Sequence, residues 1–136
     1  MFFTKKKKEK DYDIKTIENI GMKIKIFNYE VASLQDINSS EIMEILIKLE
    51  KILDMYNQLL DSGYNIYDES EINNLAKNTI KSFISKKIEF CINNDNKKEM
   101  LLSLKDELLY CNNRYTKFSK YINTEIIKLE NIIEDI

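Results

Sequence analysis

Apolar residues recur along most of this chain at alternating intervals of three and four residues. The first such stripe comprises Ile17, Ile20, Ile24, Phe27, Val31 and Leu34. This spacing places the side chains on one face of a helix. Residues Met22–Ile26 also alternate as a strand would, but a strand needs a partner and no other segment offers one. We therefore predict a helix from about Tyr12 to Ile37.

The next two stripes each follow a helix-start signal. Asn38 and Glu41 have the spacing of a capping box, with Ser39 and Ser40 as alternative caps. The second stripe is Ile42, Ile45, Leu46, Leu49, Ile52, Leu53, Tyr56, Leu59 and Leu60. Gly63 favours a left-handed backbone and ends this helix. A second box, Asp68 with Glu71, opens a third helix, which we predict from about Glu69 to Asn93. We expect the loop residues Tyr64 and Tyr67 to be partly exposed.

The fourth stripe is the longest. It comprises Leu101, Leu104, Leu108, Cys111, Tyr115, Phe118, Ile122, Glu125, Leu129, Ile132 and Ile136, of which Glu125 alone is polar. Asn96 and Glu99 form a third candidate capping box. The phase of the stripe does not change across Asn112–Asn113. We therefore predict one continuous helix from Lys97 to the C-terminus, about 60 Å long.

These elements predict an all-α protein, an antiparallel four-helix bundle with an overlong C-terminal helix. Residues 1–11 form a basic arm that we expect to be disordered, and residues 12–136 form a single helical domain. The predicted core is Leu49, Leu53, Phe83, Ile84, Leu104 and Leu108.

The overlong helix carries a prediction about partners. Its end has too little of this chain to pack against, and its stripe resembles that of a coiled coil. We therefore expect a protein partner or a second copy, most simply in a homodimer, to cover Ile126, Leu129, Ile132, Ile133 and Ile136. The alternative is a kink near Asn112–Asn113 that folds the end back.

Composition excludes much chemistry. The chain has 136 residues and no His, which rules out Ser-His-Asp and Cys-His nucleophile systems and His-ligated metals. Its two glycines cannot form a P-loop or a dinucleotide fingerprint. No cofactor or small-molecule substrate is implied. Ile, Lys and Asn supply 57 of the residues, which indicates an A/T-rich genome.

The cysteines and the first residues of the chain indicate the cellular compartment. Cys91 and Cys111 form no CxxC motif and lie on apolar stripes, so we interpret them as reduced core thiols of a reducing compartment. Neither a signal peptide nor a membrane-spanning run is visible. We expect a cytoplasmic protein.

Positive charge gathers in two places. The arm holds Lys5, Lys6, Lys7, Lys8 and Lys10, and a patch on the fourth helix holds Arg114, Lys117 and Lys120 among tyrosines. Either could bind nucleic acid or an anionic membrane, and Phe2 and Phe3 favour the membrane for the arm. The plain alternative is a solvated tail and a mixed solvent face.

Carboxylates offer the only plausible catalysis. Glu41 with Glu44, and Asp68 with Glu71, could meet around Mg²⁺. The arrangement resembles the all-α nucleotide pyrophosphohydrolases, although the second pair is DxxE where that family has ExxD. Since all four residues also serve as helix caps, we favour a non-enzymatic intracellular interaction protein, such as an adaptor, a chaperone-like protein or an assembly subunit.

Overall fold

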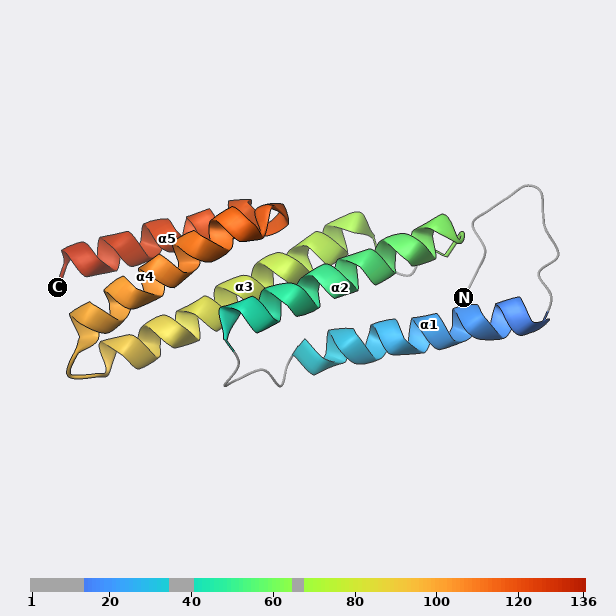
Figure 1. The fold of residues 1–136 in the computed structure, drawn as a ribbon, viewed down its shortest axis with the longest axis horizontal. Coiled ribbons are helices and arrows are strands. Elements are labelled where there is room, and N and C mark those ends of the chain that lie inside the picture. Colours follow the sequence, from blue (N-terminus) through green and yellow to red (C-terminus); the bar gives the residue numbers. More distant parts are fainter. Residues whose placement is uncertain (1–13, 35–40, 65–67) are drawn as a thin grey trace.

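The chain is all-helical throughout the residues that the computed structural model describes, which are 14–34, 41–64 and 68–136, with residues 14–20 as backbone alone. Five α-helices follow one another (Figure 1): α1 (Ile14–Ser33), α2 (Ile42–Asp61), α3 (Glu69–Ile92), α4 (Lys97–Arg114) and α5 (Ser119–Glu134), with a short 3₁₀ helix, η2 (Thr116–Phe118), between the last two. The predicted all-α class is confirmed.

The first two helices follow the predicted apolar stripes, but the cap of the second differs from the prediction. Met22–Ile26 lies inside α1, so the helical interpretation of this ambiguous segment is correct. The cap of α2 is Glu41 and not Asn38: the Glu41 backbone N–H donates to Oε1 of Glu44 at 2.8 Å. Asn38, Ser39 and Ser40 lie outside the described residues.

The two remaining cap predictions have opposite outcomes. The Asp68 backbone N–H donates to Oε1 of Glu71 at 2.9 Å, which confirms the capping box of α3. The Asn96 side chain makes no capping hydrogen bond, so the predicted box at α4 is wrong. Gly63 has φ 92°, the left-handed conformation expected behind α2.

The predicted overlong C-terminal helix is wrong. Helix α4 ends at Arg114. The chain then forms η2 and continues as α5, which lies alongside α4 (Figure 1). The alternative, a kink near Asn112–Asn113 that folds the end back, is therefore correct. The spacing hid it because a 3₁₀ helix has three residues per turn, so Tyr115 and Phe118 stay on one side across the break.

Local hydrogen bonds stabilise this corner. The Tyr115 N–H still donates to the Cys111 carbonyl at 2.8 Å, and the Phe118 N–H donates to the Tyr115 carbonyl at 3.0 Å. Tyr115 itself departs from helical geometry at φ −108° and ψ 70°. Asn112 then ties α4 to α5, with its Nδ2 donating to Oδ1 of Asn123 at 2.9 Å.

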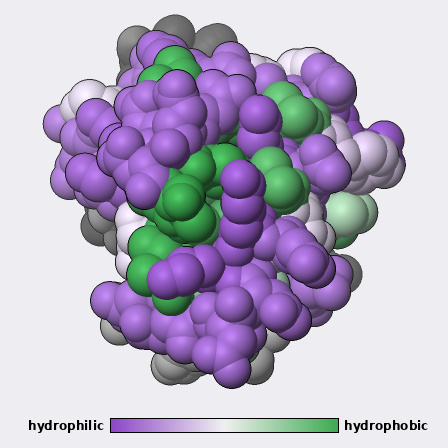
Figure 2. Space-filling view, turned by 90° about the vertical axis from the view of Figure 1, so that its left-hand side faces the viewer, coloured by the Kyte–Doolittle hydropathy of each residue, from purple (hydrophilic) through white to green (hydrophobic). Residues whose placement is uncertain are grey.

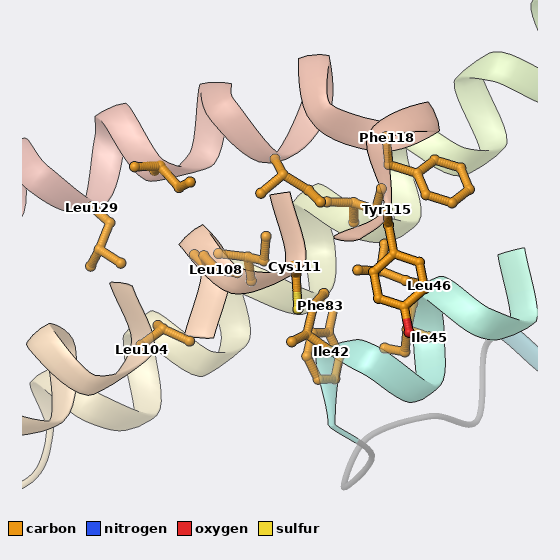
Figure 3. Packing of buried hydrophobic residues seen from close by; sticks show 14 of the residues in the cluster. Ile42, Ile45, Leu46, Phe83, Leu104, Leu108, Cys111, Tyr115, Phe118 and Leu129 are labelled. Carbon is orange, nitrogen blue, oxygen red and sulfur yellow. The ribbon is translucent and has the colours of Figure 1, made fainter. Parts of the chain in front are cut away.

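The buried apolar residues form two clusters. The larger joins the first half of α2 to α3, α4 and α5, and the smaller joins α1 to the second half of α2 and the start of α3. Tyr115 and Phe118 belong to the larger cluster, beside Ile45 and Leu46 of α2 (Figure 3). Five of the six predicted core residues are buried, and Leu53 is half-buried. The prediction that Tyr64 is partly exposed is wrong, because Tyr64 is 2% exposed and packs in the smaller cluster; Tyr67 lies outside the described residues.

Candidate functional site

The predicted partner surface on the C-terminal helix is largely inside the protein. Ile126 and Leu129 are buried in the larger cluster, and Ile132 and Ile133 are half-buried against it. Ile136 is exposed. The reason is the corner after α4: because α5 lies on α4 and α3, this chain itself covers most of the stripe.

The end of the molecule that bears the C-terminus still shows apolar surface. Green side chains gather near the middle of this end and are ringed by hydrophilic ones (Figure 2). Ile136 is 47% exposed, and Ile92 at the end of α3 is 39% exposed. This end therefore retains part of the predicted partner surface.

The predicted basic sites divide between described and undescribed residues. Lys5, Lys6, Lys7 and Lys8 lie outside the described residues. Arg114, Lys117 and Lys120 are all exposed and lie around the corner between α4 and α5. Nζ of Lys117 lies 3.7 Å from Oδ1 of Asp54 on α2, so one of the three cations links η2 to α2.

The four predicted Mg²⁺ carboxylates are not together. Glu41 and Glu44 cap the start of α2, whereas Asp68 and Glu71 cap α3 beyond the other end of α2. The 20 residues of α2 separate the pairs by about 30 Å. Within the described ranges, moreover, no group of three His, Cys, Asp or Glu side chains could hold a metal ion.

A groove lies between α1 and α3 on the described surface. Its volume is about 460 Å³. Val31, Ala32 and Leu34 line it from α1, Ile45 from α2, and Leu75, Asn78, Thr79, Ser82, Phe83 and Lys86 from α3. The lining is thus mixed: five of these residues are apolar side chains of α1, α2 and α3 and one is Ala32, while Asn78, Thr79, Ser82 and Lys86 carry polar groups. None of these lining residues is acidic.

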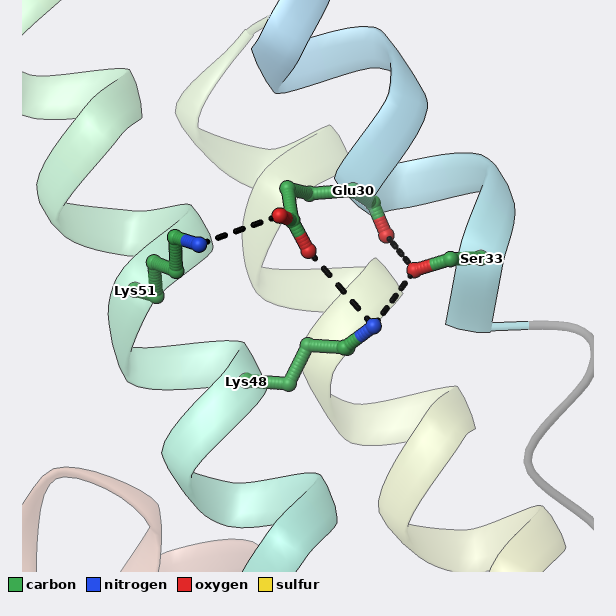
Figure 4. A network of polar contacts seen from close by, with 4 residues as sticks. All are labelled: Glu30, Ser33, Lys48 and Lys51. Atoms are coloured by element: carbon green, nitrogen blue, oxygen red, sulfur yellow. Dashed lines mark hydrogen bonds and ion pairs between the residues drawn. The ribbon is translucent and has the colours of Figure 1, made fainter.

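The α1 wall of the groove is fixed by contacts between α1 and α2. Phe27 is fully buried in the smaller cluster, near the ring of Tyr56 with centroids 6.4 Å apart. Oε2 of Glu30 accepts a hydrogen bond from Nζ of Lys51 at 3.1 Å (Figure 4). Nζ of Lys48 lies 3.5 Å from Oε1 of Glu30 and donates to Oγ of Ser33 at 2.7 Å. The hydrogen bond from Lys51 lowers the pKa of the Glu30 carboxyl, so this network stays charged near neutral pH.

The α3 wall presents a second face of that helix. Ile80, Ile84, Ile88 and Cys91 pack toward the larger cluster, while Leu75, Thr79 and Ser82 turn toward the groove. Sequence reasoning missed this face because it joins one half-buried apolar residue to small polar ones, a pattern typical of solvent-facing helix. The groove becomes visible only once α1 is placed.

Titratable groups elsewhere in the described core do not assemble into a catalytic site. Cys91 and Cys111 are free and buried, as the stripes predict, and burial raises the pKa of both thiols. Glu125 is buried and its Oε2 accepts a hydrogen bond from Nζ of Lys128 at 3.1 Å. The groove between α1 and α3 combines apolar and hydrogen-bonding side chains, as binding sites commonly do.

Compared with protein-family models, with curated proteins and with solved structures, the chain shows no match. Within the described residues, no helix combines the length and the apolar character needed to cross a membrane.

Proposed function

We propose that this protein is a non-enzymatic interaction module that binds an amphipathic helix of a partner protein in the groove between α1 and α3. The groove itself carries the proposal. Two helices form its walls and a third lies between them, which is the geometry in which a helix-in-groove ligand packs. In this proposal the helices form an antiparallel bundle in which one helix position is left for the partner.

The lining residues define the chemistry of that helix. Val31, Leu34 and Phe83 offer apolar surface, so the partner helix presents apolar side chains at i, i+4 and i+7. Helix α3, which forms one wall of the groove, carries four lysines and three glutamates, and none of the residues that line the groove is acidic. A partner helix with acidic residues beside its apolar stripe complements this wall.

A peptide-display selection tests the proposal with a defined probe. A library of helical peptides is selected against the folded chain, and the recovered peptides are titrated calorimetrically. We expect amphipathic, acidic sequences. Ser82→Trp, which places an indole in the groove at an exposed helix position, weakens their binding by about tenfold or more, or ~1.4 kcal/mol.

Ser103→Trp is the matched control, because Ser103 is an exposed helical serine on α4, away from the groove. It should leave binding unchanged. Equal affinity of the wild type and the Ser82→Trp variant for every selected peptide would refute the groove as the binding site.

Self-association is a second candidate, supported by the apolar end in Figure 2. Ile136, with half-buried Ile132 and Ile133 beside it, offers an isologous contact to a second copy. Light scattering should then report more than one chain, and Ile136→Asp should restore the monomer while Ile127→Asp, at a separate exposed site, should not. A wild type that stays monomeric at high concentration would remove this candidate.

A further inference from the structure

Helix α1 has a second apolar stripe that faces away from the rest of the protein. Met22, Ile26 and Tyr29 are 57%, 43% and 71% exposed, and their spacing of four and three residues places them on one helix face. Phe27, next to Ile26 in sequence, is fully buried on the opposite face. The outer stripe is therefore a largely exposed apolar face of α1, separate from the face that packs in the core.

Although Glu18 precedes Met22 by four residues in the sequence, the described charged side chains on either side of this stripe are positive. Lys23 and Lys25 are exposed on either side of it, whereas the nearest described acid, Glu30, is engaged by Lys48 and Lys51 of α2. Residues 1–10 carry five lysines and one glutamate, and Asp11 and Asp13 stand between them and α1. An exposed apolar face flanked by lysines and continued by a lysine-rich segment is the composition of an interfacial helix.

We propose that the outer face of α1 binds an anionic lipid surface. In this state α1 lies parallel to the membrane, with Met22, Ile26 and Tyr29 among the outer acyl carbons and headgroups, and Lys23 and Lys25 among the phosphates. A tyrosine at the edge of such a face suits the boundary between apolar and hydrated layers. The five lysines of residues 1–10 add electrostatic attraction to the same surface.

The position of α1 permits this contact. Helix α1 runs along the outer side of the molecule, opposite the α4–α5 pair, with α2 as its main neighbour (Figure 1). A planar surface can therefore approach α1 without meeting α4 or α5. The groove is lined from α1 by Val31, Ala32 and Leu34, none of which belongs to the outer stripe, so the two sites are distinct.

A nucleic acid is the competing ligand for a basic surface, and the stripe favours the lipid. Base stacking would use Tyr29, but Met22 and Ile26 gain little from phosphates or base edges. Both gain from leaving water for an acyl layer.

The absence of tryptophan from the chain allows a direct test. A single tryptophan is introduced by Tyr29→Trp, and its emission is recorded with phosphatidylserine-containing vesicles, with pure phosphatidylcholine vesicles and with single-stranded DNA. We expect a shift to shorter wavelength with the anionic vesicles. Phe90→Trp, at a site 63% exposed on α3, is the matched reporter and should not shift.

Vesicle sedimentation supplies a second measurement on the full chain. The triple variant Met22→Ser, Ile26→Ser and Tyr29→Ser should lower the partition coefficient on anionic vesicles by about tenfold or more. The control triple variant, Phe90→Ser, Tyr110→Ser and Ile127→Ser, removes three similarly exposed side chains from other helices and should bind as the wild type does. Circular dichroism verifies that both variants are folded.

Three results would overturn the proposal. The first is an unshifted emission of the Tyr29→Trp reporter when the protein sediments with anionic vesicles. The second is equal loss of binding in both triple variants. The third is binding to single-stranded DNA without binding to vesicles, which would assign the surface to nucleic acid.

Discussion

Three reactive or charged side chains lie in the core of this protein, namely Cys91, Cys111 and Glu125. All three occupy positions of the apolar stripes, so their burial follows from periodicity alone. Their chemistry does not. Burial disfavours the thiolate, and the nearby Glu107 carboxylate adds to this effect, so the pKa of Cys111 rises from its ordinary 9.0 to about 11.

The raised pKa predicts slow thiol chemistry. At pH 8 the native protein should react with a thiol reagent far more slowly than the chain unfolded in denaturant, because Cys111 is protonated and sealed from solvent. The unfolded chain also releases its Cys111 proton near pH 9, while the folded chain retains it until about pH 11. Stability should therefore fall as the pH rises through this window. Rapid labelling of the native protein would contradict the buried placement.

Glu125 predicts a gain in stability on replacement. Glu125 as a whole residue is only 3% exposed, yet the side chain of its partner Lys128 is about half exposed. Taking a charge out of water costs more than such a pair returns, whereas an apolar side chain of similar size would pack without that cost. Glu125→Leu should raise the free energy of unfolding by about 1 kcal/mol or more, measured by urea denaturation. A clear loss of stability would mean that the carboxylate has a role this account does not include.

At the scale of elements, the predicted capping box located the start of α3, whereas the box predicted for α2, Asn38 with Glu41, begins three residues before the observed cap at Glu41. Periodicity located the helical segments. It could not locate the corner at Tyr115. Proline is absent from the chain, and no glycine lies near the corner. The 3₁₀ turn also preserves the spacing from Tyr115 to Phe118, so the stripe reads as unbroken. The groove was equally invisible, because it depends on where α1 lies against α3.

The corner predicts a large effect from one aromatic side chain. Phe118 is 1% exposed and belongs to the cluster that joins α2 to α5. Phe118→Ala should lower the free energy of unfolding by about 3–5 kcal/mol, measured by chemical denaturation. Tyr110→Ala is the control on the exposed face of α4, where Tyr110 is 54% exposed, and should change stability by about 0.5 kcal/mol or less. Similar costs for both variants would show that the corner is not an anchor.

The link between α1 and α2 predicts a pH-dependent contribution. The lowered pKa of Glu30 means that its carboxylate stabilises the fold above the ordinary pKa of glutamate, and this stabilisation is lost as the pH falls through the lowered value. Lys51 is largely exposed, so the effect is small. Glu30→Gln should cost less than about 1 kcal/mol at pH 7 and nothing in strong acid, measured by thermal unfolding. An unchanged cost at low pH would contradict the ion pair.

At the scale of the whole molecule, α1 has two surfaces with different chemistry. Its wall of the groove, around Val31 and Leu34, is suited to a partner helix, and its outer stripe, around Ile26, is suited to an anionic lipid surface. Both surfaces follow from one arrangement: α4 and α5 pack on the far side of the molecule and leave α1 at the edge.

The groove is the central claim, and NMR mapping of a selected helical peptide tests it most directly. Amide shifts of the ¹⁵N-labelled chain are recorded during titration. If the partner helix binds in the groove, the largest changes fall on Val31, Leu34, Leu75, Thr79 and Ser82, and they disappear in the Ser82→Trp variant. Changes concentrated instead at Ile132, Ile133 and Ile136 would place the partner at the C-terminal end of the molecule and contradict the groove.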